Sequence, residues 1–312
     1  MNWIEPKRLA PGMTIGIMAP ASASDEDLHK IEEICASKGY KVLWGDSVHR
    51  KGLYGGTPEE QATEFQYMMT TAPCDAVLAL RGGYGTMRYL EQLDYIAIRK
   101  YRKAFIGYSD CTALHMAINR YSQLITYHGP MGVDFKPERK ADIDALFNTV
   151  EGKLQVIEPL PEPPRGAIGT DLGDGVLRGG NLTMLSMLLG TPYFLEDESW
   201  EDTLLFIEDV GEAPYKLDRM LQQFRLSGLL SRIKGLVLGT FTNCEGDEDE
   251  VDYDLGYEAL RYMEENRNSE LPEPFVCYVP TGHGSPHQTL PLGATISFRY
   301  ISNTIIVHPY TK

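Results

Sequence analysis

The chain has 312 residues, which suits two domains or one large domain, and 43% of them are hydrophobic, which is ample for a packed core. Its formal net charge is −15, from 44 acidic and 29 basic residues. This charge argues against nucleic acid and anionic membrane surfaces as partners, and it says little about a small-molecule substrate.

The sequence also indicates a compartment. No apolar run approaches the roughly 20 residues of a membrane-spanning helix, and residues 1–7 lack the basic and apolar regions of a signal peptide. The cysteines are scattered, with no C-x-x-C pair, at Cys35, Cys74, Cys111, Cys244 and Cys277. We therefore expect a cytoplasmic protein without a disulfide framework or a structural zinc site.

Short apolar runs alternate with helical patterns in the first half of the chain. Buried strands are predicted at 14–20, 41–44, 75–80, 104–106 and 124–127. Helices are predicted to about Ser37, capped by Ser22 or Ser24, and then from Thr57, Thr86 and Thr112. This alternation predicts right-handed βαβ units and a parallel sheet, in which ligands bind beyond the carboxyl ends of the strands.

The composition changes between about Asn148 and Asp174, where the prolines at 159, 161, 163 and 164 interrupt a stretch with little periodicity. We interpret 148–174 as a linker between an N-terminal domain at 1–147 and a C-terminal domain at 175–312. In the second domain, the run at 176–181 leads into a predicted helix through Leu189. Strands are predicted at 203–209, 235–239 and 275–279, helices from 214 and at 255–266, and a closing hairpin at 295–299 and 304–308.

A serine stands at a sharp turn after the fourth predicted strand. The run Gly107-Tyr108-Ser109-Asp110-Cys111 separates that strand from the helix at Thr112, a strand–turn–helix pattern typical of a nucleophile elbow. Cys111 replaces the usual last glycine, but it is small enough for close packing of helix on sheet. An ordinary structural turn remains the alternative at this point.

A serine hydroxyl needs a neighbouring base, and His283 is the best placed of the seven histidines, in a Gly-His-Gly turn at a strand end. An ordinary loop histidine is the alternative. His287 competes locally and forms a His-x-x-x-His spacing with His283, but Gly284 and Pro286 disfavour the helix that a metal site would need. His128 is interpreted as a packed residue at a strand end. We expect neither a metal nor another cofactor.

Glu208 is the candidate acid that would orient the base. It ends the apolar strand at 204–207, where an unpaired carboxylate is costly to bury, so a histidine is a suitable partner. Asp209 follows it and would face the other way. A solvated carboxylate, or one that caps the helix after Pro214, is the alternative for Glu208.

The glycine-rich run at 81–85 can supply a second oxyanion donor opposite the N–H of Asp110. It has the spacing of neither a Walker loop nor a dinucleotide site, and a plain strand–helix turn remains open. Arg81 can hold a substrate carboxylate or pair with a structural acid. The acidic run at 245–250 does not match a calcium loop, and we interpret it as solvated, with Asp252 or Asp254 capping the next helix.

Taken together, these motifs resemble the LD-carboxypeptidase family of serine peptidases, which also contains the microcin C self-immunity hydrolases. The matching stretches occur in family order over nearly the whole chain: Ile17-Met18-Ala19-Pro20-Ala21-Ser22, Arg81-Gly82-Gly83-Tyr84-Gly85, Gly107-Tyr108-Ser109-Asp110, His128-Gly129-Pro130, Gly179-Gly180-Asn181-Leu182, Glu208-Asp209-Val210 with Pro214-Tyr215 and Asp218-Arg219, and Gly282-His283-Gly284.

The resemblance implies a Rossmann-like or flavodoxin-like N-terminal domain with a parallel sheet, and a C-terminal swivelling β/α domain. It implies Ser109 as nucleophile, His283 as general base and Glu208 as the acid that orients the base. The backbone N–H groups of Asp110 and Gly83 would form the oxyanion hole. Arg81, Gly82 and Tyr84 are the candidate substrate-binding residues.

The activity implied by the resemblance is hydrolysis of the L,D-amide to the C-terminal D-alanine of cytoplasmic muropeptide tetrapeptides, in peptidoglycan recycling. The alternative is an immunity-type hydrolysis of an aminoacyl- or peptidyl-nucleotide amide; the compact chain favours the carboxypeptidase. A noncatalytic binding protein that uses the same crevice is a third hypothesis. A homodimer is also expected. The sequence leaves open whether lysine or diaminopimelate occupies the third substrate position.

Overall fold

The structure is a computed structural model of the chain and describes residues 3–153, 155–157, 165–166, 171–194, 200–246, 253–301 and 304–309. It divides into two compact units. The first comprises Met1–Lys153 with Thr289–Gly293, and the second comprises Leu154–Gln288 with Ala294–Lys312. The prolines of the predicted linker and residues 247–250 of the acidic run lie outside the described residues, so the predicted limits of the linker stay a prediction.

The first unit contains a sheet whose strands are β1 Thr14–Met18, β2 Lys41–Trp44, β3 Ala76–Ala79, β4 Ala104–Gly107, β5 Thr126–His128 and β12 Leu290–Leu292. Their order is β12-β5-β4-β3-β1-β2. Strands β1 to β5 pair in parallel, and β12 pairs with β5 in the antiparallel sense. The order 2-1-3-4-5 of the parallel strands is that of flavodoxin-like sheets, which confirms the predicted fold of this domain.

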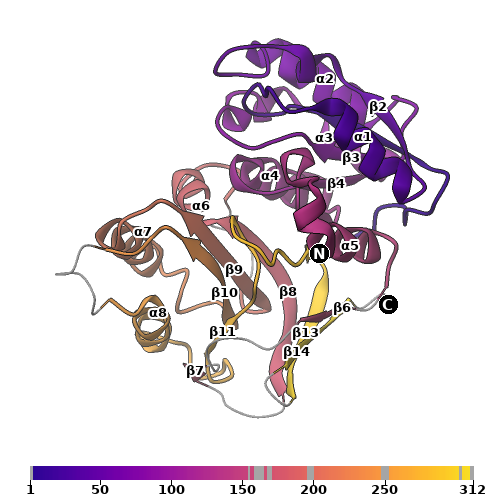
Figure 1. Cartoon of the computed structure of the whole chain (residues 1–312). Helices are drawn as coiled ribbons and strands as arrows, with labels where there is room; N and C mark the ends of the chain where they lie inside the picture. Colours follow the sequence, from indigo (N-terminus) through magenta and orange to yellow (C-terminus); the bar gives the residue numbers. More distant parts are fainter. Residues whose placement is uncertain are drawn as a thin grey trace. The chain divides into compact units, whose positions relative to one another are not determined.

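The helices of this unit are α1 Leu28–Ser37, α2 Pro58–Met69, α3 Tyr95–Tyr101, α4 Thr112–Ser122 and α5 Lys140–Val150 (Figure 1). Short 3-10 turns occur at Asp46–His49, Thr86–Arg88, Leu90–Gln92, Ser109–Cys111, Gly132–Asp134 and Pro137–Arg139. A core of buried aliphatic side chains joins one face of the sheet to α1 and α5. It includes Ile15, Ile17, Leu78 and Ile106 from the strands, with Ile31 and Leu146 from the helices.

Two predicted helix starts are wrong, and a third is confirmed. Helix α1 begins at Leu28 and is capped by Asp27, whose carboxylate accepts from His29 N, and not by Ser22 or Ser24. Thr86 begins a 3-10 turn rather than an α-helix. Helix α2 follows Thr57 as predicted, with a capping box that joins Thr57 and Glu60.

The second unit contains a mixed sheet of order β6-β14-β13-β8-β9-β10-β11-β7. Its strands are β6 Gln155–Ile157, β7 Arg165–Gly166, β8 Asp171–Asn181, β9 Thr203–Val210, β10 Gly235–Thr242, β11 Phe275–Tyr278, β13 Thr295–Ile301 and β14 Thr304–Pro309. Strands β8 to β11 are parallel, and the predicted closing hairpin is the antiparallel pair β13–β14. The helices are α6 Leu182–Leu188, α7 Pro214–Leu226 and α8 Leu255–Glu264 (Figure 1).

The capping residue Asp254 of α8 is one of the two predicted, and its carboxylate accepts from Tyr257 N. In α7, the predicted apolar face includes buried Leu217, Leu221 and Phe224. Leu229 and Leu230 are buried too, but they lie beyond the end of this helix at Leu226. Within the described residues, no helix is long and apolar enough to cross a membrane.

Candidate active site

Ser109 stands at the apex of a sharp turn between β4 and α4. Its φ angle is 61°, in the left-handed region that non-glycine residues rarely adopt. Ser109–Cys111 forms a single 3-10 turn that leads directly into α4 at Thr112. The predicted strand–turn–helix is therefore present, and the strained backbone at its apex is typical of functional turns.

The elbow packs closely against the start of α4. A Cβ atom on Gly107 would lie 3.0 Å from Sγ of Cys111, so a larger residue there would press on the start of α4. Nε2 of buried His115 lies 2.9 Å from the carbonyl oxygen of Gly107 and donates to it. Burial lowers the pKa of His115 to about 4, so this imidazole is neutral at pH 7. Burial also raises the pKa of the Cys111 thiol, which is therefore unreactive.

The glycine-rich loop after β3 lies directly against Ser109. A Cβ atom on Gly82 would be 2.9 Å from the Cβ of Ser109 and 3.1 Å from its hydroxyl oxygen. Gly83 has φ of 112°, and a Cβ atom there would lie 2.3 Å from Oγ of Ser22. The structure thus brings the loop and the elbow together, as the sheet order predicts for adjacent strands β3 and β4.

Two other predicted substrate-binding residues flank these glycines. Arg81 is half-buried, and its Nη1 donates to the carbonyl of Ala23 at 3.4 Å. Tyr84 is 53% exposed, and its ring centroid lies 5.7 Å from that of Tyr54. Their contact with a substrate stays a prediction.

Glu208 and His283 meet in the second unit. Glu208 lies on β9 and is fully buried, and its Oε2 accepts a hydrogen bond from Nδ1 of His283 at 2.7 Å. Burial raises the pKa of Glu208, and the hydrogen bond and charge of His283 oppose that rise. The sequence therefore identified the right partner for this buried carboxylate.

Two glycines allow this close approach. A Cβ atom on Gly239 of β10 would lie 2.8 Å from the Cβ of Glu208. Gly282 has φ of 145°, and a Cβ atom there would lie 2.9 Å from Oε2 of Glu208. The glycine before His283 thus serves two needs, the unusual backbone conformation and the space beside the carboxylate.

Asp209, the next residue of β9, has different partners. Its carboxylate accepts from Nδ2 of Asn181 at 2.8 Å, and from both N and Oγ1 of Thr183 at 2.9 and 2.8 Å. These bonds tie β9 to the start of α6. Asp209 is therefore a structural acid, whereas Glu208 holds a histidine.

The other candidate histidines are buried within their own units. His128 ends β5 with its ring 5.9 Å from that of Tyr108, in agreement with a packed strand-end residue. His287 is also fully buried. Across the described ranges, no group of three or more His, Cys, Asp or Glu side chains is arranged to hold a metal ion.

Ser109, Gly83 and Asp110 belong to the first unit, and Glu208 and His283 belong to the second. The structure brings together Ser109 with Gly82, and Glu208 with His283. The contact between Ser109 and His283 stays a prediction.

The sequence matches the models of two protein domains and is similar to known proteins over most of its length. The model of the LD-carboxypeptidase N-terminal domain matches residues 15–129, and that of the C-terminal domain matches residues 174–298. A probable murein peptide carboxypeptidase of Bacillus subtilis is 33% identical, over 97% of this chain and 94% of its own.

Two further similarities bear on the choice of activity. The crystal structure of muramoyltetrapeptide carboxypeptidase from Oxalobacter formigenes has a TM-score of 0.78 and 31% identity, over 94% of this chain and 98% of its own. The microcin C7 self-immunity protein MccF of Escherichia coli is 25% identical, over 96% of this chain and 94% of its own.

Proposed function

The chain belongs to the LD-carboxypeptidase family, and from this premise we propose that it is a serine-type carboxypeptidase that removes the C-terminal D-alanine from muropeptide tetrapeptides. The family membership makes it a carboxypeptidase-type hydrolase. The murein peptide substrate comes from the name of the Bacillus relative, and the tetrapeptide comes from the name of the Oxalobacter structure.

One observation carries the proposal more than any other, the 2.7 Å hydrogen bond between Nδ1 of His283 and the buried carboxylate of Glu208. A carboxylate accepts hydrogen bonds, so it fixes the proton of the neutral imidazole on Nδ1. The other ring nitrogen, Nε2, then carries the lone pair that a general base requires.

Catalysis would proceed through a covalent intermediate on Ser109. His283 takes the proton of the Ser109 hydroxyl while the oxygen attacks the carbonyl of the L,D-amide. The imidazolium then protonates the leaving amine of D-alanine, and a water molecule, deprotonated by His283, hydrolyses the acyl-enzyme. This mechanism requires the Ser109 hydroxyl to come within hydrogen-bond distance of His283.

The backbone N–H groups of Asp110 and Gly83 would stabilise the oxyanion of the tetrahedral intermediate. The position of Gly82 against Ser109 supports this role for its neighbour Gly83. Arg81, Gly82 and Tyr84 would contact the peptide, with Arg81 as partner of a substrate carboxylate.

A muropeptide substrate suits a cytoplasmic enzyme of peptidoglycan recycling, and the scattered cysteines suit a reducing compartment. We propose a homodimer, with neither nucleic acid nor membrane as a partner. The described cysteines are all free thiols.

The second candidate is hydrolysis of an aminoacyl-nucleotide amide, favoured by the similarity to the self-immunity protein. The experiment compares kcat/KM for L-Ala-γ-D-Glu-L-Lys-D-Ala and its diaminopimelate analogue with kcat/KM for aspartyl sulfamoyl adenosine. We expect the tetrapeptides to be preferred. Preference for the nucleotide would overturn the proposed substrate and support the second candidate.

A further inference from the structure

The two proposed oxyanion donors lie on different loops, and two buried hydrogen bonds join those loops. The N–H of Thr86 donates to Oδ2 of Asp110 at 2.9 Å. The Thr86 hydroxyl also donates, to the backbone carbonyl of Asp110 at 2.7 Å. Both residues are buried, so water does not compete for the groups that form these bonds.

These two bonds, both donated by Thr86, join the 3-10 turns that follow the two loops. Thr86 begins the 3-10 turn after the glycine-rich loop, and Asp110 lies within the 3-10 turn of the elbow. Burial raises the pKa of Asp110, and bonds from the backbone N–H groups of Thr86 and Gly85 oppose that rise. The side chain of Asp110 thus holds the end of the glycine-rich loop that contains Gly83.

Ser22 holds the same loop from its other side. Its N–H donates to the carbonyl of Gly82 at 3.3 Å, and its hydroxyl oxygen accepts from the N–H of Tyr84 at 3.1 Å. These contacts span Gly83, whose α-carbon faces the Ser22 side chain so closely that a Cβ would lie 2.3 Å from Oγ. Ser22 therefore leaves the peptide units on either side of Gly83 little freedom.

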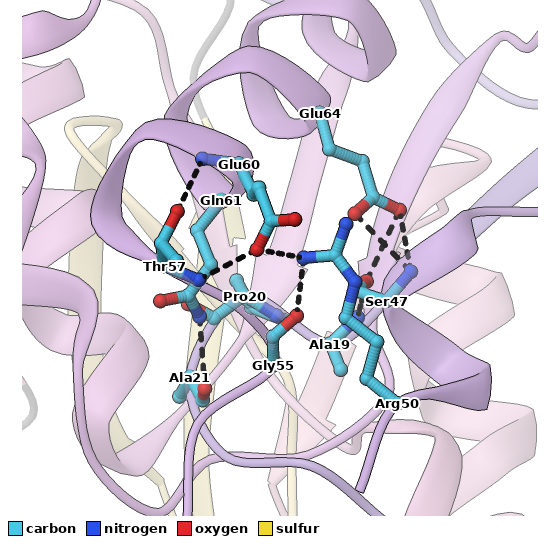
Figure 2. A network of polar contacts seen from close by, with 10 residues as sticks. All are labelled: Ala19, Pro20, Ala21, Ser47, Arg50, Gly55, Thr57, Glu60, Gln61 and Glu64. Atoms are coloured by element: carbon cyan, nitrogen blue, oxygen red, sulfur yellow. Dashed lines mark hydrogen bonds and ion pairs between the residues drawn. The ribbon is translucent and has the colours of Figure 1, made fainter.

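The segment before Ser22 is itself fixed by the region around α2 (Figure 2). Nε2 of buried Gln61 donates to the carbonyls of Pro20 and Ala21, at 2.9 Å each. The N–H of Ala19 donates to the hydroxyl of Ser47 at 2.8 Å. Side chains thus bond two consecutive carbonyls and one N–H group of this segment, which restrains the backbone before Ser22.

We propose that Thr86 and Ser22 are positioning residues that hold the Gly82-Gly83-Tyr84 backbone against the elbow, so that the N–H groups of Gly83 and Asp110 converge on one oxyanion. The inference rests on the proposed function, because converging N–H groups at Gly83 and Asp110 would serve acyl transfer at Ser109. Neither side chain touches the substrate in this account, and each acts through the backbone it holds.

The test compares variants that differ in one hydroxyl. Thr86→Val keeps the shape and removes the hydroxyl, and Thr86→Ser keeps the hydroxyl. Ser22→Ala removes the acceptor for Tyr84 N, and Ser24→Ala is its control, because the Ser24 hydroxyl bonds to Glu26 N within the same segment. Steady-state release of D-alanine, the rate of Ser109 labelling by a fluorophosphonate, and thermal unfolding are measured for each.

A misplaced donor weakens binding of the transition state more than binding of the ground state. We expect Thr86→Val and Ser22→Ala to lower kcat by about 10-fold to 100-fold while KM stays within about 2-fold. Labelling of Ser109 slows in parallel. Thr86→Ser restores most of kcat, and Ser24→Ala behaves as the wild type.

The inference would be overturned if Thr86→Val and Thr86→Ser had equal kcat and if Ser22→Ala and Ser24→Ala also had equal kcat. A change in KM without a change in kcat would overturn it too. If Thr86→Val does not fold, the Ser22 and Ser24 pair decides. If the wild type releases no D-alanine but is labelled at Ser109, the proposed substrate fails, and the labelling rates still test the positioning. Absence of both activities overturns both proposals.

Discussion

Nδ1 of His283 lies 2.7 Å from Oε2 of Glu208, and these residues are 75 positions apart in the chain. The glutamate is fully buried on β9, where an unpaired carboxylate would be costly. Its neighbour Asp209 is equally inaccessible but bonds to Asn181 and Thr183. Two adjacent acids of one strand therefore serve different purposes, and substitution can separate them.

Glu208→Gln should lower kcat by about 10²-fold to 10⁴-fold, because the amide no longer fixes the proton of His283 on Nδ1. The size of the side chain and one acceptor oxygen are retained, so the melting temperature should change little. Asp209→Asn is the matched control. It weakens the bonds to Thr183 and should lower the melting temperature while most of kcat is kept. The reverse assignment of effects would contradict these roles.

Ser109→Ala should abolish turnover and leave the melting temperature nearly unchanged, because a half-buried elbow hydroxyl contributes little packing. The backbone strain at φ of 61° remains in this variant. Ser109→Gly should be more stable than Ser109→Ala by about 1 kcal/mol, since glycine adopts this conformation without strain. Thermal unfolding of the two variants checks the order. A large loss of melting temperature in Ser109→Ala would count against the elbow.

Gly83→Ala should lose activity and stability together, whereas Gly12→Ala should lose stability alone. Both glycines have positive φ, 112° and 98°, so alanine costs about 1 kcal/mol at each. A Cβ atom on Gly83 would lie 2.3 Å from the side chain of Ser22, whereas a Cβ atom on Gly12 would have no other atom within 4 Å. Urea unfolding and D-alanine release separate the two effects. Comparable activity in both variants would show that the Gly83 backbone is not needed.

Acidification should destabilise the fold through His115. Burial lowers its folded pKa from 6.5 to about 4, so its stabilising contribution is complete above pH 6.5 and is lost as the pH falls toward 4. The lost contribution is about 3 kcal/mol. His115→Gln should therefore flatten the fall in unfolding free energy between pH 6.5 and 4, as measured by urea titration.

The buried acids act in the opposite direction, because the raised pKa of Glu208 and Asp110 favours the fold as the pH falls. Only the difference between the wild type and His115→Gln isolates the histidine. His29→Gln, at an exposed position of α1, is the control. An identical pH slope in the wild type and His115→Gln would contradict a buried neutral imidazole.

The sequence predicted the order of strands and helices because apolar runs and capping residues are local signals. The start of α2 shows this, since Thr57, Pro58 and Glu60 together satisfy the first turn. The cap of α1 was not predicted, because the Ser22 hydroxyl is occupied by Tyr84, 62 positions away. Likewise, Thr86 bonds to Asp110 and begins a 3-10 turn. Such long-range bonds have no local signature.

Strand β12 was also missed. Its three residues, Leu290–Leu292, are too few for a periodic pattern, and the central Pro291 argues against a strand. It nevertheless pairs with β5 at the edge of the first sheet. More of the candidate site than of its surroundings could be predicted from the sequence. The elbow and the Glu208–His283 pair followed from motifs, whereas the contacts of Ser22, Thr86 and His115 became visible only in the structure.

The central claim is tested most directly by mass-spectrometric detection of D-alanine released from L-Ala-γ-D-Glu-L-Lys-D-Ala and its diaminopimelate analogue. A peptide with L-alanine at the C-terminus and the Ser109→Ala protein are measured beside them. The account predicts release from the L,D-peptides alone, and none by Ser109→Ala. Release of the L-terminal residue at a comparable rate, or undiminished release by Ser109→Ala, would contradict it.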